Sequence, residues 1–141
     1  MSIEENIKPG KILYLNVCFP HEEVPHNKYM IVVAVGNYPL LLKINTSEQQ
    51  SEIARKMKEH LFKIKKSTYD LFLEHDSYVD CGTVWWTLLK TEEIVNQLKA
   101  DPSRIKGDVS ADHKNEIIRL VEKSKSIEPR HKRIIAEGLR E

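Results

Sequence analysis

No stretch of this 141-residue sequence approaches the ~20 consecutive apolar residues that a membrane-spanning helix needs. The longest apolar runs, residues 30–35 and 40–42, have the length of strands. The opening segment, MSIEENIKPG, is polar and acidic, unlike a secretory signal. Two cysteines, Cys18 and Cys81, are too few for a disulfide framework. We therefore expect a cytoplasmic protein with reduced thiols and no membrane partner.

A strong charge imbalance is also lacking, because the formal net charge is only +1. That total neither favours nor excludes a nucleic-acid partner, since local patches matter more. Residues 55–66 hold six lysines and arginines against the single acid Glu59, whereas residues 68–81 hold four acids and no lysine or arginine. This asymmetry predicts either one basic face or a solvated helix and loop, and the sequence leaves both open.

Apolar runs predict three strands in the first third of the chain. Residues 11–19 lie between two proline-containing breaks and include the apolar residues Ile12, Leu13, Leu15, Val17 and Phe19. Residues 29–35 are rich in Val and Ile, which suits a strand buried on both faces. The turn signal Gly36-Asn37 then leads into residues 39–44, so the second and third strands are predicted to form a hairpin.

The later pattern mixes helices and strands. Apolar residues recur at helical spacing from Ile53 to Leu61, which predicts a helix inserted within residues 49–66. Strand signals follow at residues 69–73, 78–81 and 83–87. Helices are expected to begin at the N-cap candidates Thr91 and Ser110 and at Pro129, with Asp101-Pro102 ending the first of them.

This element order predicts an α+β fold in a single domain spanning residues 1–141. A small antiparallel β-barrel with the inserted helix occupies about residues 8–110, and C-terminal helices occupy about residues 110–141.

Two patterns that suggest chemistry fail on closer reading. His21 and His26 are five residues apart with Pro25 between them, whereas the zinc-protease motif needs two histidines four apart on a helix. We therefore predict no metal site, and we expect no cofactor. Cys81 follows Asp80, whose charge would raise the thiol pKa, so a small buried residue is the better interpretation than a nucleophile.

Two other patterns leave alternatives open. His75 is a candidate acid or base because a histidine side chain can serve as either near neutral pH, while Asp76-Ser77 beside it also fits a local turn. Trp85 and Trp86 must point to opposite faces of a strand. One is expected in the core; the other is either exposed, and able to stack on a base, or covered by the terminal helices.

Taken in order, several segments resemble the MazF/PemK-like toxins, the ribonuclease components of bacterial toxin–antitoxin pairs. That family opens with a Gly-Asp pair before an apolar strand, starts its second strand with Arg-Pro and ends its third in Thr or Ser. An Asp-Ser pair then enters a further strand, and a late Gly-apolar-Ser strand precedes the C-terminal helix. The matching segments are residues 9–15, 28–33, 45–47, 76–79 and 107–110. The resemblance covers about residues 10–125, while the stretch 49–66 and the tail after Ser124 are additional.

The resemblance implies an SH3-like β-barrel that cleaves single-stranded RNA without metal, works as a homodimer and is held by a cognate antitoxin protein. Lys28 stands where the family has its catalytic arginine, and Tyr29 where it has proline. A lysine neutralises a phosphate but lacks the planar two-point contact of guanidinium.

Metal-free cleavage uses the 2′-hydroxyl of the RNA as nucleophile, so the protein must supply a base, an acid and a cation. The catalytic candidates are Lys28 as the cation, Thr46 and Ser47 as phosphate donors, and His75 for proton transfer. His26 is a second candidate for proton transfer. The RNA-binding candidates are His26, Lys63, Lys65 and Lys66.

Two rival functions remain open because a fold does not decide an activity. The same barrel can be a non-catalytic module that binds nucleic acid or a protein partner, and the lysine at position 28 favours this rival. A third possibility is an interaction protein whose partner docks on the tail, where Arg130, Lys132 and Arg133 cluster.

Overall fold

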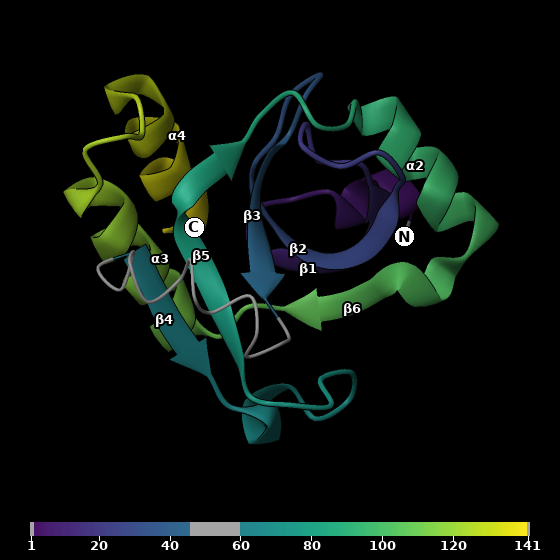
Figure 1. The fold of residues 1–141 in the computed structure, drawn as a ribbon, viewed down its shortest axis with the longest axis horizontal. Coiled ribbons are helices and arrows are strands. Elements are labelled where there is room, and N and C mark those ends of the chain that lie inside the picture. The colour runs from purple at the N-terminus through teal and green to yellow at the C-terminus, as the bar shows by residue number, and fades with distance from the viewer. Residues whose placement is uncertain (1, 46–59, 141) are drawn as a thin grey trace.

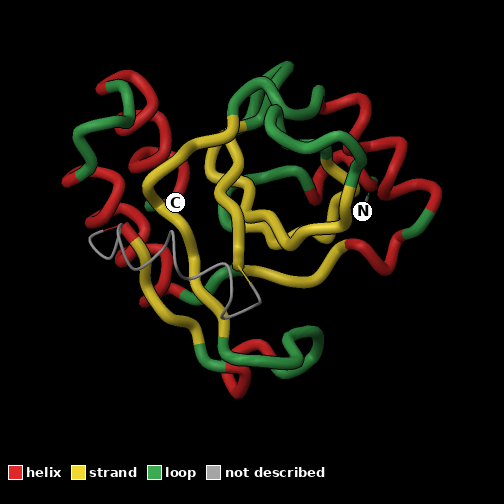
Figure 2. Tube along the Cα trace, in the orientation of Figure 1, coloured by secondary structure: helices red, strands yellow, loops and turns green. Residues whose placement is uncertain are grey.

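The computed structural model describes residues 2–45 and 60–140, which form a mixed α+β structure (Figures 1 and 2). The strands are β1 (Lys11–Val17), β2 (His26–Ala34), β3 (Leu40–Asn45), β4 (Leu61–Ile64), β5 (Ser77–Trp85) and β6 (Ile105–Asp108). The α-helices are α2 (Thr91–Ala100), α3 (Ala111–Lys123) and α4 (Pro129–Leu139). Short 3-10 turns lie at η1 (Ile3–Asn6), η4 (Lys66–Tyr69) and η5 (Pro102–Arg104). The predicted α+β class and the C-terminal helices are confirmed.

The strands form one sheet in the order β4-β5-β3-β2-β1-β6, and every neighbouring pair is antiparallel. The sheet curls into a half-barrel (Figure 2). Among the described strands, the edge strands β4 and β6 are not paired with each other, and α2 lies on the β1 side of the sheet, away from β4 (Figure 1). The antiparallel pairing is therefore as predicted, but this part of the chain does not close into a complete barrel.

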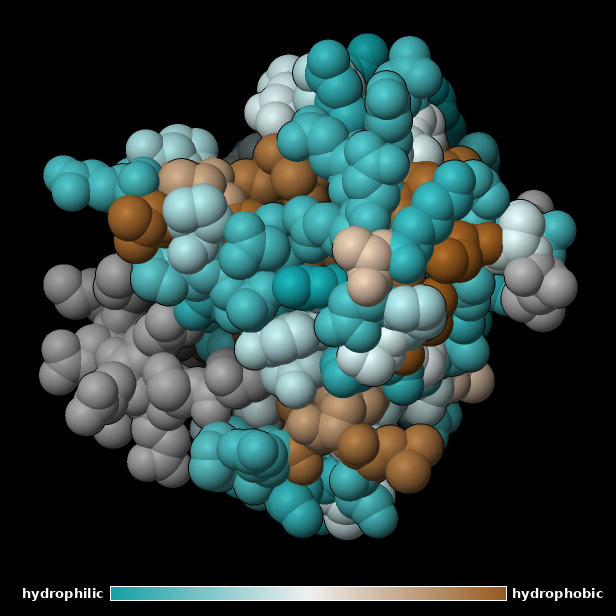
Figure 3. Space-filling view, turned by 90° about the vertical axis from the view of Figure 1, so that its right-hand side faces the viewer, coloured by the Kyte–Doolittle hydropathy of each residue, from teal (hydrophilic) through white to brown (hydrophobic). Residues whose placement is uncertain are grey.

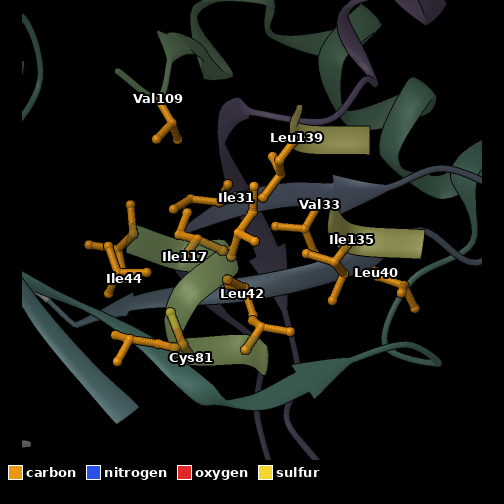
Figure 4. Packing of buried hydrophobic residues seen from close by; sticks show 14 of the residues in the cluster. Ile31, Val33, Leu40, Leu42, Ile44, Cys81, Val109, Ile117, Ile135 and Leu139 are labelled. Carbon is orange, nitrogen blue, oxygen red and sulfur yellow. The ribbon is translucent and has the colours of Figure 1, made fainter. Parts of the chain in front are cut away.

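Side-chain alternation gives the sheet two apolar faces, each with its own cover. The inner face of the curl packs against α2 through a cluster that includes Leu13, Leu15, Met30, Leu41, Ile94 and Leu98. The outer face packs against α3 and α4 through a second cluster that includes Ile31, Val33, Leu42, Ile117, Ile135 and Leu139 (Figure 4). Seen from the side of α2, the surface is mostly hydrophilic, with smaller apolar patches between polar residues (Figure 3). No helix in the described ranges is long and apolar enough to cross a membrane.

Several local predictions are confirmed. β2 and β3 form the expected hairpin, with Met30 opposite Lys43. Helix α2 ends at Ala100, just before Asp101-Pro102. Ser110 caps α3, since its side chain accepts a hydrogen bond from the His113 backbone N–H at 3.3 Å. Pro129 is the first residue of α4.

Other local predictions are wrong. Residues 69–73 are not a strand, because Tyr69 ends η4 and turns inward, where its hydroxyl lies 2.7 Å from His113 Nδ1. The expected strands at 78–81 and 83–87 are one continuous strand, β5. Thr91 does not cap α2, because it is already the first helical residue and its hydroxyl donates to the Gly36 carbonyl.

The helix expected within residues 49–66 lies mostly outside the described residues. Its last predicted apolar position, Leu61, belongs to strand β4 instead, opposite Asp80. The next residues of the segment extend that strand as far as Ile64, which pairs with Ser77. For Leu61 alone, helical spacing predicted the wrong element, because its pairing partner, β5, comes later in the chain.

Gly138 allows α4 to approach the sheet closely. A Cβ at this position would lie 2.9 Å from Pro9 Cγ and 3.3 Å from the Val33 carbonyl oxygen. We expect Gly138→Ala to lower the free energy of unfolding by about 1–3 kcal/mol through overpacking, although alanine is the better helix former. Urea unfolding measures this change. Glu137→Ala, on the exposed side of the same helix, is the control, and a Gly138→Ala protein as stable as the parent would contradict the close packing.

Candidate functional site

Two lysines and an aspartate lie together on the inner face of the sheet, toward the start of β2 and the end of β3. Lys43 in β3 pairs with Asp80 in β5. Met30 in β2 pairs with Lys43 on its other side. Lys28, two residues before Met30, therefore lies on the same face as Lys43, one step nearer the start of the strand. We name Lys28, Lys43 and Asp80 the inner-face cluster.

The surroundings of Lys43 lower the pKa of its ammonium group. Its partial burial lowers the pKa of the ammonium group, Asp80 acts in the opposite direction, the nearby charge of Lys28 lowers it further, and Glu22 raises it. The Lys43 Nζ also lies 5.0 Å from the centre of the Phe19 ring. A partly dehydrated lysine beside a second lysine attracts an anion strongly and gives up its proton more easily than an ordinary lysine.

The loop between β1 and β2 adds an acid and a histidine to this region. Phe19 packs into the inner core, with its ring 4.6 Å from that of Trp85, which fixes the loop against the sheet. Its backbone N–H donates to Glu22 Oε1 at 3.4 Å. The other carboxylate oxygen of Glu22 lies 3.5 Å from His26 Nε2, an ion pair when the histidine is protonated. Glu22 thus contacts His26 directly, and its charge raises the pKa of Lys43.

The part of the inner face of the sheet near β4 carries further polar groups. Tyr78 in β5 has Asn45 opposite it on one side and Lys63 on the other. The buried Oδ1 atom of Asn45 has no hydrogen-bond partner among the described residues. Lys63 Nζ lies 3.5 Å from Asp76 Oδ2, so part of its charge is already balanced.

The structure brings together some of the residues that the sequence predicts and separates others. Lys28, His26 and Lys63 share the inner face by their strand register. Thr46 and Ser47 lie outside the described residues. Lys65 and Lys66 are exposed at the start of η4, where the Lys66 backbone N–H donates to Asp76 Oδ1 at 2.8 Å.

His75 is exposed in the loop before β5, where its carbonyl accepts a hydrogen bond from Ser77 Oγ. Within residues 2–45 and 60–140, no hydrogen bond, ion pair or ring contact joins the His75 side chain to Lys28 or His26. The proton-transfer role of His75 thus gains no support from the geometry. The local-turn interpretation of Ser77 agrees with this hydrogen bond.

Lys43 and Asp80 were missed by sequence reasoning, although each left a signal. Lys43 is the single charge of the otherwise mostly apolar strand β3, and Asp80 is the single charge of β5. Opposite charges within two apolar strands are costly to bury unless they meet. Only the strand register, however, shows that these two residues lie opposite each other.

The other residues considered for a chemical role have structural positions in the fold. Cys81 is fully buried, and burial raises the pKa of its thiol, so it is no nucleophile. No group of three or more His, Cys, Asp or Glu side chains able to hold a metal ion occurs in the part of the chain that the structure describes. Trp85 packs in the inner core, whereas Trp86 is about half exposed, so the expectation of opposite faces is confirmed.

Comparison with known proteins places the chain in no family. No protein-family model matches the sequence, and the curated proteins contain no match to it.

Proposed function

We propose that this chain is a metal-independent endoribonuclease that cleaves single-stranded RNA, on an SH3-like barrel, as the toxin of a toxin–antitoxin pair. The observation that carries the proposal is the placement of Lys28 and Lys43 side by side on the inner face with Asp80. Two neighbouring cations suit the dianionic phosphorane that forms when a 2′-hydroxyl attacks the adjacent phosphate. The ordered resemblance of residues 10–125 to MazF/PemK-like toxins supports the same activity.

In the proposed reaction, the 2′-oxygen bonds to phosphorus while the bond to the 5′-oxygen breaks. His26, oriented by Glu22, accepts the proton of the 2′-hydroxyl. Lys28 binds the non-bridging oxygens. Lys43, whose lowered pKa makes it a better acid than an ordinary lysine, donates a proton to the leaving 5′-oxygen. The products are a 2′,3′-cyclic phosphate and a 5′-hydroxyl end.

Other residues are proposed to hold the RNA rather than to cleave it. Lys63 extends the positive charge across the inner face to β4, and Lys65 and Lys66 continue it along the exposed start of η4. Such contacts neutralise backbone phosphates without reading sequence. Thr46 and Ser47 keep the phosphate-binding role that the resemblance implies.

Asp80 is expected to set the alkaline limit of the reaction. Cleavage needs the protonated form of Lys43, so its rate falls as pH rises through the pKa of Lys43, which is below that of an ordinary lysine. Asp80 raises this pKa, so Asp80→Asn should move the alkaline limb of the pH–rate profile to lower pH. Asparagine keeps the side-chain oxygen that accepts from the Gly82 N–H.

The matched control for this experiment is Asp70→Asn, a charge loss in the exposed loop after η4. Its alkaline limb should coincide with that of the parent protein. If the alkaline limb of Asp80→Asn is unchanged or lies at higher pH, Lys43 is not the residue that donates the proton to the leaving oxygen.

Expression of the chain without a partner protein is expected to slow cell growth, because each enzyme molecule destroys many RNA molecules. The growth rate after induction measures this, with Lys28→Ala expressed to the same soluble level as the control. Normal growth at high soluble expression of the parent chain would contradict the toxin assignment.

A non-catalytic RNA-binding module is the second candidate, and lysine at position 28 favours it because a lysine lacks the fork of the family's arginine. Purified protein mixed with a long single-stranded RNA separates the two functions. Retarded but intact RNA is the result expected of the binding module, and shortened RNA is the result expected of the enzyme.

A further inference from the structure

An apolar groove lies beside the first turns of α4. The turn after β2, the residues after β5 and α4 itself form the groove, and its volume is about 420 Å³. Four large hydrophobic side chains line it, each between 38% and 59% exposed: Val35, Tyr38, Trp86 and Ile134. Small-molecule sites have volumes of about 300–1,000 Å³ and mostly apolar walls with a few polar groups. The groove therefore has the size and lining of a site for one small apolar molecule.

The walls of the groove are anchored by the core. Because Trp85 packs into the inner core, the next residue, Trp86, leaves the sheet on the opposite side. Its ring lies 5.8 Å from the ring of His131 in α4. Ile134 follows His131 by three residues on the same side of α4, while the next residue, Ile135, is fully buried. The groove is therefore made by residues beside the core rather than by a loosely packed loop.

A histidine with no hydrogen-bond partner among the described residues lies in the wall of the groove. His131 is only 6% exposed and lines the groove. Its ring nitrogens are not among the wholly buried side-chain atoms that lack a partner, so they reach the surface at the groove. A neutral imidazole has one N–H donor and one acceptor, and leaving them unpaired in an apolar setting is unfavourable. This histidine favours a ligand with a polar end.

The first turn of α4 leaves backbone donors unpaired beside this histidine. The N-cap residue, Glu128, makes no side-chain hydrogen bond to the turn. Arg130 and His131 are the second and third helical residues, so their N–H groups have no acceptor inside the helix, and neither donates to another described residue. Lys132 is the first residue of α4 whose N–H is paired, to the Glu128 carbonyl at 3.0 Å. Free N–H groups at the start of a helix bind anionic oxygens.

The charges of the lining give the sign of the ligand. Of the described residues that line the groove, Arg130 carries a permanent positive charge and none is an acid. Arg130 lies 3.9 Å from Glu128, but both side chains are more than half exposed, so water screens this pair. A guanidinium binds a carboxylate through two parallel hydrogen bonds. One cation beside mostly apolar walls suits a ligand with a single negative charge and an apolar body.

We propose that the groove binds a small aromatic carboxylate. Its ring system packs against Tyr38 and Trp86, whose half-exposed rings favour an aromatic partner over an aliphatic one. Its carboxylate accepts hydrogen bonds at the start of α4, from Arg130 and His131. The groove lies beside the turn after β2, whereas Lys28 lies near the start of that strand, so this site is separate from the proposed RNA site and does not depend on it.

Titration of the full chain with 2-naphthoate, followed by two-dimensional NMR of the ¹⁵N-labelled protein, tests the proposal. A ligand of this size is expected to bind with a Kd of about 1 mM or lower. The backbone N–H signals of Arg130 and His131 and the indole N–H signal of Trp86 should shift together. The matched probe is 2-naphthamide, which keeps the rings and lacks the charge. It should bind at least about tenfold more weakly, because it loses hydrogen bonds to a charged group.

Three exposed charges of this region provide matched variants. Arg130→Gln should weaken binding of 2-naphthoate about tenfold. Glu128→Gln should tighten it about two- to fivefold, because it removes the acid beside Arg130. Arg133→Gln, an exposed residue of α4 outside the groove, should bind as the parent does. The dispersion of each variant's spectrum checks that it is folded.

Three results would overturn the proposal. They are the absence of shifts at millimolar 2-naphthoate, equal binding of 2-naphthamide, and parent-like binding by folded Arg130→Gln. Stronger binding of adenosine monophosphate than of 2-naphthoate would also overturn it, because the groove would then be a nucleotide site. None of these results bears on RNA cleavage, so this inference and the proposed function fail separately.

Discussion

Lys28→Ala is expected to lower the rate of RNA cleavage by about 100- to 1,000-fold, the usual effect of removing one stabiliser of transition-state charge. The structure explains why one lysine has this effect. Lys43 shares the face, but its pKa is already lowered by burial and by Lys28, so Lys43 is suited to release a proton rather than to remain a fixed cation. In the proposed mechanism, Lys28 supplies the positive charge that stays on the phosphate throughout the reaction.

The variant should keep the stability of the parent, because Lys28 is a partly buried residue near a strand start and belongs to neither core cluster. The rate is measured with a labelled single-stranded RNA, and urea unfolding checks the fold. Lys28→Arg should retain or raise the activity by supplying the two-point contact of guanidinium. Lys125→Ala, which removes an exposed lysine after α3, is the matched control. If Lys28→Ala cleaves as fast as the parent protein, the assignment of the site is wrong.

Ile135→Ala is expected to lower the free energy of unfolding by about 2–5 kcal/mol, the range for truncating a fully buried aliphatic side chain to alanine. Ile135 is inaccessible to solvent and lies beside Val33 and Leu40, where α4 covers the outer face of the sheet (Figure 4). Its loss leaves a cavity between the helix and the sheet. Few other side chains of α4 are buried against the sheet. We therefore expect the decrease in the free energy of unfolding to fall near the upper end of this range.

Urea unfolding followed by circular dichroism measures this change. Leu71→Ala is the control, since that side chain is almost wholly exposed and its loss should change the free energy of unfolding by less than about 0.5 kcal/mol. If Ile135→Ala lowers the free energy of unfolding by less than about 1 kcal/mol, α4 is not docked on the sheet, because truncating a buried isoleucine has a larger effect.

The elements predicted well from the sequence are those specified by local patterns. The β2–β3 hairpin has a long apolar run and a turn signal, and α3 and α4 each have an identifiable first turn at Ser110 and Pro129. The wrong predictions concern segments whose structure depends on pairing with a strand distant in the sequence. β4, for example, has only four residues and exists because β5 lies beside it. Short strands of this kind take their conformation from their neighbours rather than from their own sequence.

The candidate site was predicted in part for the same reason. Lys28 was selected by its position in a resemblance and His26 by its place in a polar loop. Lys43 and Asp80 were not selected, because a single charge in a strand is normally taken to face solvent. That they are neighbours depends on the register of three strands, which places Lys43 between Met30 and Asp80. No local pattern contains that register.

The most direct test of the central claim compares two substrates of the same sequence in EDTA, one ordinary RNA and the other methylated at every 2′-oxygen. If the inner-face cluster promotes attack by the 2′-hydroxyl, the parent protein cleaves the ordinary RNA, leaves 2′,3′-cyclic phosphate ends and leaves the methylated RNA intact. Cleavage of the methylated RNA, or no cleavage of either substrate by folded protein, would contradict the account.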